Sequence, residues 1–266
     1  MTIVTTLSAS LQAPTKQARI EGPLDAITAA LAQGAARHEA EGSFAHEHID
    51  LLHRHGLLAL TAAHAHGGAG AGLLRAREVI DAVAHGHPSI ALVLAMHYVQ
   101  TRLLSEPGCR WPSGVRARVL HDVVRRGALL HPLRAEPAAM GPGELPTTTA
   151  RRTAAGWRLS GQKIHGTGFE ALRWLLVWAR TDEAAPRVGT FLVSRQWPGV
   201  SAVRARDCIG LRAIASSDVS FDDVALPLEH AVDLRHPEQW RLAPDLTQQL
   251  WTATLIGTVY TTTGSA

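Results

Sequence analysis

The stretch Gly156-Trp-Arg-Leu-Ser-Gly-Gln-Lys-Ile-His-Gly-Thr-Gly168 decides how the rest of the chain is interpreted. Between Trp157 and Lys163, apolar or small residues alternate with polar ones, which is the period of a strand with one buried face. Two glycines around Thr167 end that strand, and Trp174–Ala179 is an unbroken apolar run typical of a more deeply buried strand. The hydroxyl of Thr167 and nearby N–H groups could bond the edge of a planar ring that approaches the backbone. An ordinary glycine-rich connection is the alternative.

The composition is that of a globular protein. Of the 266 residues, 46% are hydrophobic and 18% are charged, which is enough for one large domain or two modest ones. The net charge is only +3 and the basic residues are dispersed, so we expect no nucleic-acid partner. Two cysteines, Cys109 and Cys208, give no disulfide framework and fit a reducing compartment.

We also expect a cytoplasmic location with no membrane partner. Residues 1–20 lack the charged start and apolar run of a signal peptide. The longest apolar run, Ile90–Met96, is too short to cross a bilayer.

Apolar spacing divides the chain into a helical part and a strand-rich part. Residues 1–23 are expected to form a loose tail, and residues 24–127 an all-helical domain in which Ser89 caps a helix. Residues 128–228 are expected to form a small barrel or sandwich, and residues 229–266 turn helical again. The predicted strands are Ala128–Arg134, Thr147–Thr153, Trp157–Ile164, Trp174–Ala179, Gly189–Val193, Val200–Val203 and Val219–Leu226.

Histidines recur in pairs two residues apart, at positions 46/48, 53/55, 64/66 and 85/87. Zinc coordination is the functional interpretation of such pairs. Side chains two apart on a helix do not face each other, and no cysteine or carboxylate completes a recognisable ligand set. We therefore predict no metal site.

Several motifs, in order, resemble the acyl-CoA dehydrogenase family. Gly161-x-Lys163-x-His165-x-Thr167-Gly168 is similar to the flavin-contacting segment of that family, and Leu133-Arg-Ala-Glu-Pro137 to its "leu-Thr-Glu-Pro" segment. Pro198-Gly-Val200, Gly210-Leu-Arg212 and Ser217–Pro227 follow in the same order. The resemblance covers residues 24 to about 260. It implies an α+β fold in which an all-α N-terminal domain precedes a β-barrel-like middle domain, followed by the first helix of a C-terminal bundle.

The resemblance also implies an oxidoreductase that uses FAD to oxidise the CH–CH group of an acyl thioester such as acyl-CoA. Thr167 corresponds to a hydroxyl near the reactive nitrogen of the flavin ring, and His165 stands where the family often has a stacked aromatic residue. Ala135 stands at a hydroxyl position, so only a backbone N–H can serve the ring there. Leu133 and Gly166 complete the implied cofactor-binding set. The family further implies an electron-transfer partner and a homo-oligomer.

In the family, the helical bundle supplies the catalytic glutamate, and here only its first helix has a counterpart. We therefore expect no catalytic base in this chain and an impaired reaction. The apolar residues of that helix are expected to form an exposed surface; they are Leu250, Trp251, Leu255, Ile256, Val259 and Tyr260. Arg212 is expected to be structural and to pair with a carboxylate.

Two other functions remain open. One is a two-component monooxygenase of the same fold, which would use FMN and a flavin reductase partner. Such enzymes carry a histidine near the ring at the position of His97, for which packing in a helical core is the alternative. The other is a non-catalytic remnant that binds flavin weakly or not at all.

Overall fold

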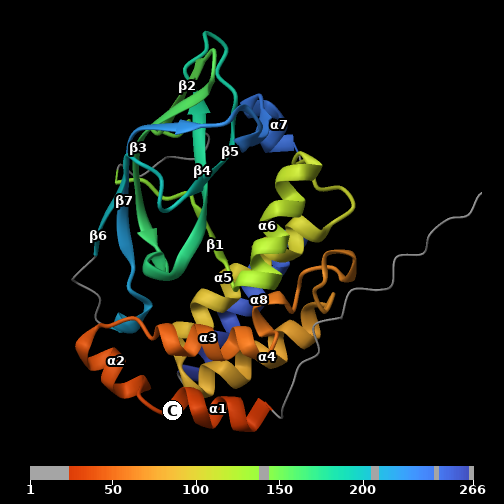
Figure 1. Cartoon of the computed structure of the whole chain (residues 1–266), viewed down its shortest axis with the longest axis vertical. Coiled ribbons are helices and arrows are strands. Elements are labelled where there is room, and N and C mark those ends of the chain that lie inside the picture. The colour runs from red at the N-terminus through yellow and green to blue at the C-terminus, as the bar shows by residue number, and fades with distance from the viewer. Residues whose placement is uncertain (1–23, 138–143, 205–209, 243–245, 264–266) are drawn as a thin grey trace, which may run out of the picture.

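The computed structural model describes residues 24–137, 144–204, 210–242 and 246–263. In Figure 1 most helices of the N-terminal part lie below the strands, and the last of them, α6 (Ser113–Arg126), stands beside the strands. Among the residues described, the larger of two hydrophobic clusters joins both parts, since it contains Leu94 of a helix and Val177 of a strand. The α+β architecture predicted from the sequence, with helices first and a sheet second, is confirmed. In the described ranges, no helix is both long enough and apolar enough to span a membrane.

Most residues of α5 (Pro88–Ser105) are buried. This helix is buried on several sides because it packs against α4, against the strand β1 (Leu129–Leu133) and against the C-terminal helix α8. The other N-terminal helices are α1 (Leu24–Ala32), α2 (Ala35–Glu41), α3 (His46–Arg54), α4 (Leu73–Gly86) and α6 (Ser113–Arg126).

The start of α5 differs from the prediction. The helix begins at Pro88, whose fixed φ and missing N–H suit the first helical position. His87 is therefore the capping residue, and its Nδ1 accepts a hydrogen bond from the N–H of Ile90 at 3.3 Å. Ser89 lies inside the helix, and its hydroxyl donates to Glu39 at 3.2 Å.

Eight strands form one sheet in the order β6-β7-β3-β2-β4-β5-β8, and β1 pairs with β4 in parallel beside that path. All seven predicted strands are present, and β4 is buried along most of its length, as its apolar run indicates. The strands after β1 are β2 (Thr149–Thr153), β3 (Gly156–Gly166), β4 (Leu172–Thr181), β5 (Val188–Ser194), β6 (Val200–Arg204), β7 (Ser217–Leu226) and β8 (Ala231–Arg235).

The helical prediction after Pro227 is wrong for the first part of that segment. Ala231–Arg235 is the strand β8, which pairs antiparallel with β5 and buries Val232. Five residues are too few to separate a period of two from a helical period, so the free edge of β5 decides the outcome. The chain becomes helical afterwards, in α7 (Pro237–Leu242) and α8 (Leu246–Thr263).

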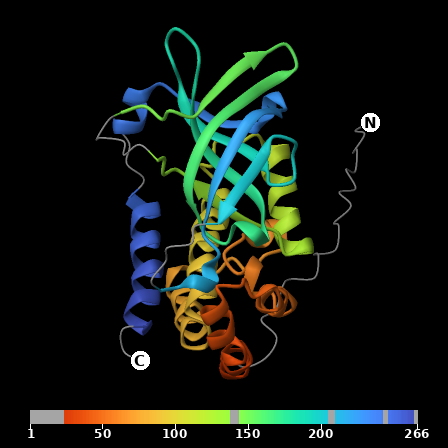
Figure 2. The ribbon, with the colours of Figure 1, turned by 90° about the vertical axis from the view of Figure 1, so that its left-hand side faces the viewer.

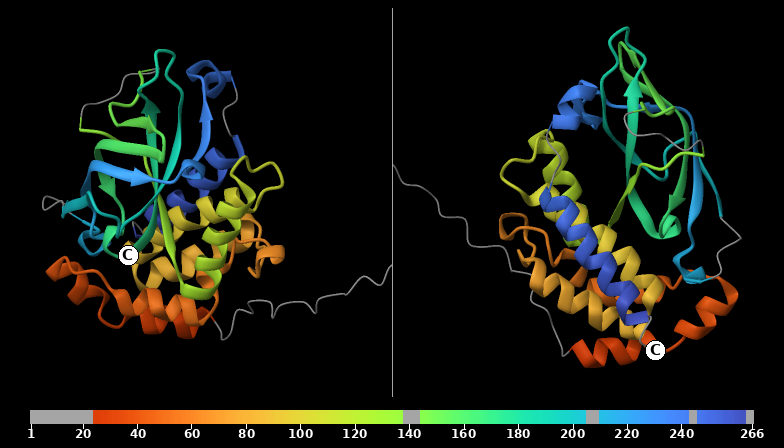
Figure 3. Two further views of the ribbon diagram at one scale, coloured as in Figure 1. Left: turned by 45° about the horizontal axis from the view of Figure 1, so that its top comes forward. Right: turned by 180° about the vertical axis from the view of Figure 1, so that it is seen from behind.

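The expected exposed surface on α8 is largely wrong. The helix packs along α4 and α5 and is seen beside them in Figures 2 and 3. Trp251, Leu255 and Val259, which share one face at a spacing of four, are buried there. Leu250 and Tyr260 lie on the other side and are exposed, as predicted. The helix α8 packs against apolar faces of α4 and α5. The residue spacing within α8 alone could not show that these faces are present.

We expect Val259→Ala to lower the free energy of unfolding by about 2 kcal/mol, because two buried carbon groups are lost and a cavity remains. Leu250→Ala on the exposed side of the same helix is the matched control, with an expected change of at most about 0.5 kcal/mol. Urea unfolding of both variants measures this. Equal effects of the two substitutions would contradict the packing of α8.

Candidate functional site

Strand β3 is irregular just before Thr167. Its register with β7 shifts between Lys163 and Gly166. Within this bulge His165 has a φ of 59°, in the left-handed region that residues other than glycine seldom occupy. The His165 side chain is exposed, while its backbone is bonded by the buried ring of His131 on β1. Burial lowers the pKa of His131 to about 4, so that ring is neutral at neutral pH.

The ends of β1 and β3 meet at this bulge. The N–H of Ile164 donates to the carbonyl of Ala135 at 2.9 Å. Gly166 packs against Leu133, since a Cβ added to the glycine would lie 3.6 Å from a leucine methyl. The structure thus brings together the predicted flavin-contacting residues, which we call the strand-end cluster: Leu133, Ala135, His165, Gly166 and Thr167.

Members of the strand-end cluster differ in accessibility. Leu133 and Gly166 are buried, so they contribute packing and backbone. Ala135 and His165 are exposed, and Thr167 is half-buried. Among the described residues, the hydroxyl of Thr167 makes one long contact, 3.4 Å, to the carbonyl of His165. That hydroxyl is therefore available to a ligand.

A buried ion pair lies directly beneath the cluster. Lys163 Nζ is 2.6 Å from Glu136 Oε1, and neither side chain is accessible to solvent. Glu136 also accepts from the N–H and hydroxyl of Thr147, at 2.7 and 2.6 Å, and from those of Thr148, at 3.0 and 2.7 Å. Burial alone would raise the pKa of Glu136, but the bonds from Lys163 and the threonines outweigh it and hold the pKa at about 2. Through these bonds Glu136, just after β1, is connected to Lys163 on β3 and to the two threonines that precede β2.

Sequence reasoning did not assign a role to Lys163 or Glu136, although both stand in the motifs quoted above. Two signals were present. Lys163 takes an inward position in the alternation of its strand, where a lone charge is costly, and Glu136 lies shortly after the end of β1 at Leu133.

The Gly210-Leu-Arg212 turn is fastened to α2 in a different way from the prediction. Glu39 accepts the backbone N–H groups of Arg212 and Ala213, at 2.7 and 3.0 Å. The guanidinium of Arg212 donates instead to the carbonyl of Ala40 at 2.8 Å, near the end of α2. Arg212 has a structural role, as predicted, but its guanidinium binds the carbonyl of Ala40 and not a carboxylate. The nearby carboxylate of Glu39 is already bonded by two backbone N–H groups.

His97 lies in the core between α5 and β1. Its Nε2 donates to the carbonyl of Leu58 at 2.8 Å, and its Nδ1 accepts from the N–H of Leu130 at 3.3 Å. The ring is fully buried, which lowers its pKa to about 4. Both ring nitrogens have backbone partners, and this geometry supports the packing interpretation of His97.

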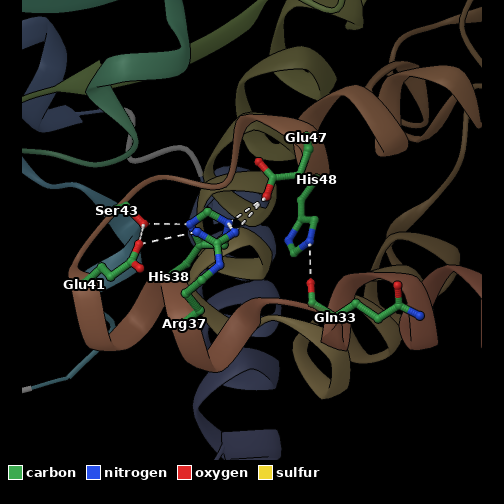
Figure 4. Close-up of polar contacts among 7 residues, drawn as sticks. All are labelled: Gln33, Arg37, His38, Glu41, Ser43, Glu47 and His48. Carbon is green, nitrogen blue, oxygen red and sulfur yellow. Dashed lines mark hydrogen bonds and ion pairs between the residues drawn. The ribbon is translucent and has the colours of Figure 1, made fainter.

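Several other histidines serve in the packing of the first helices. Figure 4 shows His38 between Ser43 and Glu47, with nitrogen–oxygen distances of 2.8 and 2.7 Å. His48 is 3.2 Å from the carbonyl of Gln33. Within the part of the chain that the structure describes, no three histidine, cysteine, aspartate or glutamate side chains are arranged to hold a metal ion.

A cleft of about 430 Å³ lies at the end of β1, and its described lining includes sequence neighbours of the strand-end cluster but none of the five cluster residues. Pro132 and Arg134, which flank the inward-pointing Leu133 on β1, both line it. Its other lining residues come from α5, from the loop between α5 and α6, and from β4, β5, β8 and α7. The cleft and the cluster therefore share the end of β1.

Comparison with known proteins agrees with this arrangement. The family model described as acyl-CoA dehydrogenase, N-terminal domain, matches residues 23–108, and that of the middle domain matches residues 135–224. The chain belongs to the acyl-CoA dehydrogenase-like family.

Among curated proteins, a putative acyl-CoA dehydrogenase, YdbM, of Bacillus subtilis is 30% identical over 204 residues, which are 76% of this chain and 53% of that protein. Benzylmalonyl-CoA dehydrogenase of Aromatoleum aromaticum is 28% identical over 165 residues, covering 62% of this chain and 43% of the relative. The chain thus spans about half the length of the curated relatives it matches.

Two solved structures show the same fold. KijD3 in complex with FMN and a dTDP-linked amino-keto sugar superposes with a TM-score of 0.77 and 25% identity, covering 94% of this chain and 64% of that one. FMN-bound TdsC from Paenibacillus sp. A11-2 gives a TM-score of 0.78 at 20% identity, covering 90% and 60% of the two chains.

Proposed function

We propose that this chain holds a flavin at the strand-end cluster and takes part in an oxidoreductase reaction. The observation that supports it is the combination of an outward-facing His165 and Thr167 with a backbone fixed from below by His131 and by the Lys163–Glu136 pair. A backbone held in place from the core side, with the His165 side chain exposed and that of Thr167 half-buried, suits a planar ligand. A bound flavin would supply the redox chemistry that side chains lack.

Each cluster residue has a distinct part in holding the ring. The Thr167 hydroxyl donates to or accepts from the ring edge. Ala135 offers only its N–H, since its carbonyl already accepts from Ile164. His165 supplies a flat ring for stacking, and the left-handed backbone of the bulge directs it outward.

Two specific reactions are compatible with flavin binding at this site. Acyl-thioester dehydrogenation is supported by two curated relatives that are named as dehydrogenases of CoA thioesters, and FAD is the flavin that the family resemblance implies for it. It requires a base for the α-proton. Among the described residues near the cluster, Glu136 is ionised within the buried pair, and the two carboxylates of the cleft, Glu106 and Asp233, already bind arginines.

We favour the second reaction, monooxygenation with FMN and a separate flavin reductase, because structures of the same fold are known with FMN bound. In this reaction the chain binds and positions the flavin and the substrate, and it needs no carboxylate base of its own. The FMN complex of KijD3 supports this choice.

We expect the flavin-loaded chain to keep its visible absorbance when acyl-CoA thioesters are added without oxygen, because the three described carboxylates considered near the cluster and the cleft are all held in ion pairs. Chemical reduction with dithionite is the control that shows the flavin can be bleached. Bleaching by acyl-CoA, in protein free of other dehydrogenases, would restore the dehydrogenase assignment. Failure to retain either FAD or FMN would favour the non-catalytic remnant.

A further inference from the structure

Arg134 lies in the cleft beside the strand-end cluster. It follows Leu133, whose side chain is buried in the core, and its own side chain is exposed toward the cleft. The guanidinium carbon lies 4.3 Å from the centre of the Trp178 ring. Within the described ranges, Arg134 is the one charged residue lining this cleft that has no ion-pair partner.

The other charges of the cleft are compensated. Asp233 binds Arg235 through two contacts of 2.6 and 2.9 Å and lies 3.2 Å from Arg110. Glu106 pairs with Arg102, which lies outside the cleft. Both carboxylates are therefore occupied, and the cleft carries an excess of positive charge.

One wall of the cleft is aromatic and rigid. The rings of Trp178 and Trp240 meet edge to face with their centres 4.7 Å apart. Trp240 is fixed by a hydrogen bond from its Nε1 to the carbonyl of Val188 at 2.8 Å, and Arg235 lies 4.1 Å from its ring centre. Such a wall suits a planar or apolar ligand body.

We propose that this cleft binds a small-molecule substrate that bears a phosphate or carboxylate group, with Arg134 binding the oxyanion and the two tryptophans contacting the body. A guanidinium in contact with an indole ring keeps its N–H edge free for bidentate bonds to an oxyanion. A volume of about 430 Å³ lies in the range of small-molecule sites. The assignment rests on the proposed function, because it takes the cleft beside the flavin-contacting cluster as the substrate's place.

Calorimetric titration of the purified chain with four probes tests the proposal. Thymidine diphosphate and indole-3-acetate carry an oxyanion and an aromatic body, while thymidine and indole carry the body alone. We expect the two anions to bind and each neutral molecule to bind at least tenfold more weakly. Absent binding of both anions, or equal binding of the neutral molecules, would overturn the proposal.

Substitutions at Arg134 test whether this residue binds the oxyanion of the ligand. Arg134→Gln is expected to weaken anion binding roughly 10- to 100-fold, because a charged hydrogen bond is lost, and Arg134→Lys to weaken it less. Arg125→Gln, at an exposed arginine of α6 away from the cleft, is the matched control and should bind as the parent does. Equal binding by Arg134→Gln and the parent would overturn the assignment.

Flavin titrations of the same proteins separate this proposal from the proposed function. Unchanged binding of FMN and riboflavin to Arg134→Gln supports a substrate oxyanion. A loss of FMN binding with riboflavin unaffected would show that Arg134 holds the cofactor's phosphate, which overturns the substrate assignment. A parent chain that binds the anions but neither flavin would refute the proposed function and leave the anion site supported.

Discussion

Lys163→Met is expected to lower the free energy of unfolding by about 3–5 kcal/mol, because it leaves the charge of Glu136 buried without its partner. Both side chains of this pair are inaccessible to solvent, and Glu136 links the end of β1 to Thr147, Thr148 and β3. Chemical unfolding followed by far-UV circular dichroism measures the loss. The same variant should also bind flavin more weakly, since the strand-end cluster lies on this pair.

The matched control for Lys163→Met is Arg187→Met, which removes one partner of an ion pair in the same sheet region. Arg187 and Glu183 are 2.7 Å apart, but both side chains are about one third exposed. Water compensates an exposed pair, so this variant should lose at most about 1 kcal/mol. Comparable losses in the two variants would contradict the role of the buried pair.

Acidification from pH 7.5 to pH 5 is expected to destabilise the chain by about 2 kcal/mol for each of three buried histidines. His87, His97 and His131 have pKa values of about 4 in the folded chain because burial disfavours their charged forms. The unfolded chain binds these protons as the pH falls below about 6.5, whereas the folded chain does not until about 4. The contribution of these three histidines to the free energy of unfolding is therefore fully present above about pH 6.5 and is lost progressively down to about pH 4.

Urea unfolding at pH 7.5, 6 and 5 tests this dependence. His131→Gln should reduce the difference between pH 7.5 and pH 5 by about 2 kcal/mol, whereas His121→Gln, at an exposed position of α6, should leave it unchanged. The pKa of Glu136, at about 2, keeps that carboxylate from contributing in this range. Equal stability of the parent at pH 7.5 and pH 5 would show that these rings are not buried in their neutral forms.

The regular elements could be predicted because local patterns determine them. The alternation from Trp157 to Lys163 and the apolar run of Trp174–Ala179 correspond to β3 and β4, with ends that moved by a few residues. Elements that depend on a distant partner could not be predicted in this way. β8 exists because β5 has a free edge, and α8 is buried because α4 and α5 offer an apolar face.

In the candidate site, too, local patterns could be predicted from the sequence, whereas contacts between distant segments could not. The sequence could indicate Thr167, His165 and Ala135 as flavin-contacting residues. Each stands in a short motif whose residue types and spacing resemble those of the family. The bond from the His131 ring to the His165 backbone and the pairing of Lys163 with Glu136 join different strands, so only the folded chain brings them together. The left-handed conformation of His165 also has no sequence signal, since its residue type does not require it.

Flavin affinity of Thr167→Val tests the central claim most directly. The parent chain should retain a flavin, and the variant should bind it about 1–2 kcal/mol more weakly because one neutral hydrogen bond is lost. Thr153→Val, at the far end of β2 from the cluster, should bind flavin as the parent does. Fluorescence titration with FMN and FAD gives the three affinities. Equal affinities for Thr167→Val and the parent would remove Thr167 from the site and contradict the placement of the flavin at the strand-end cluster.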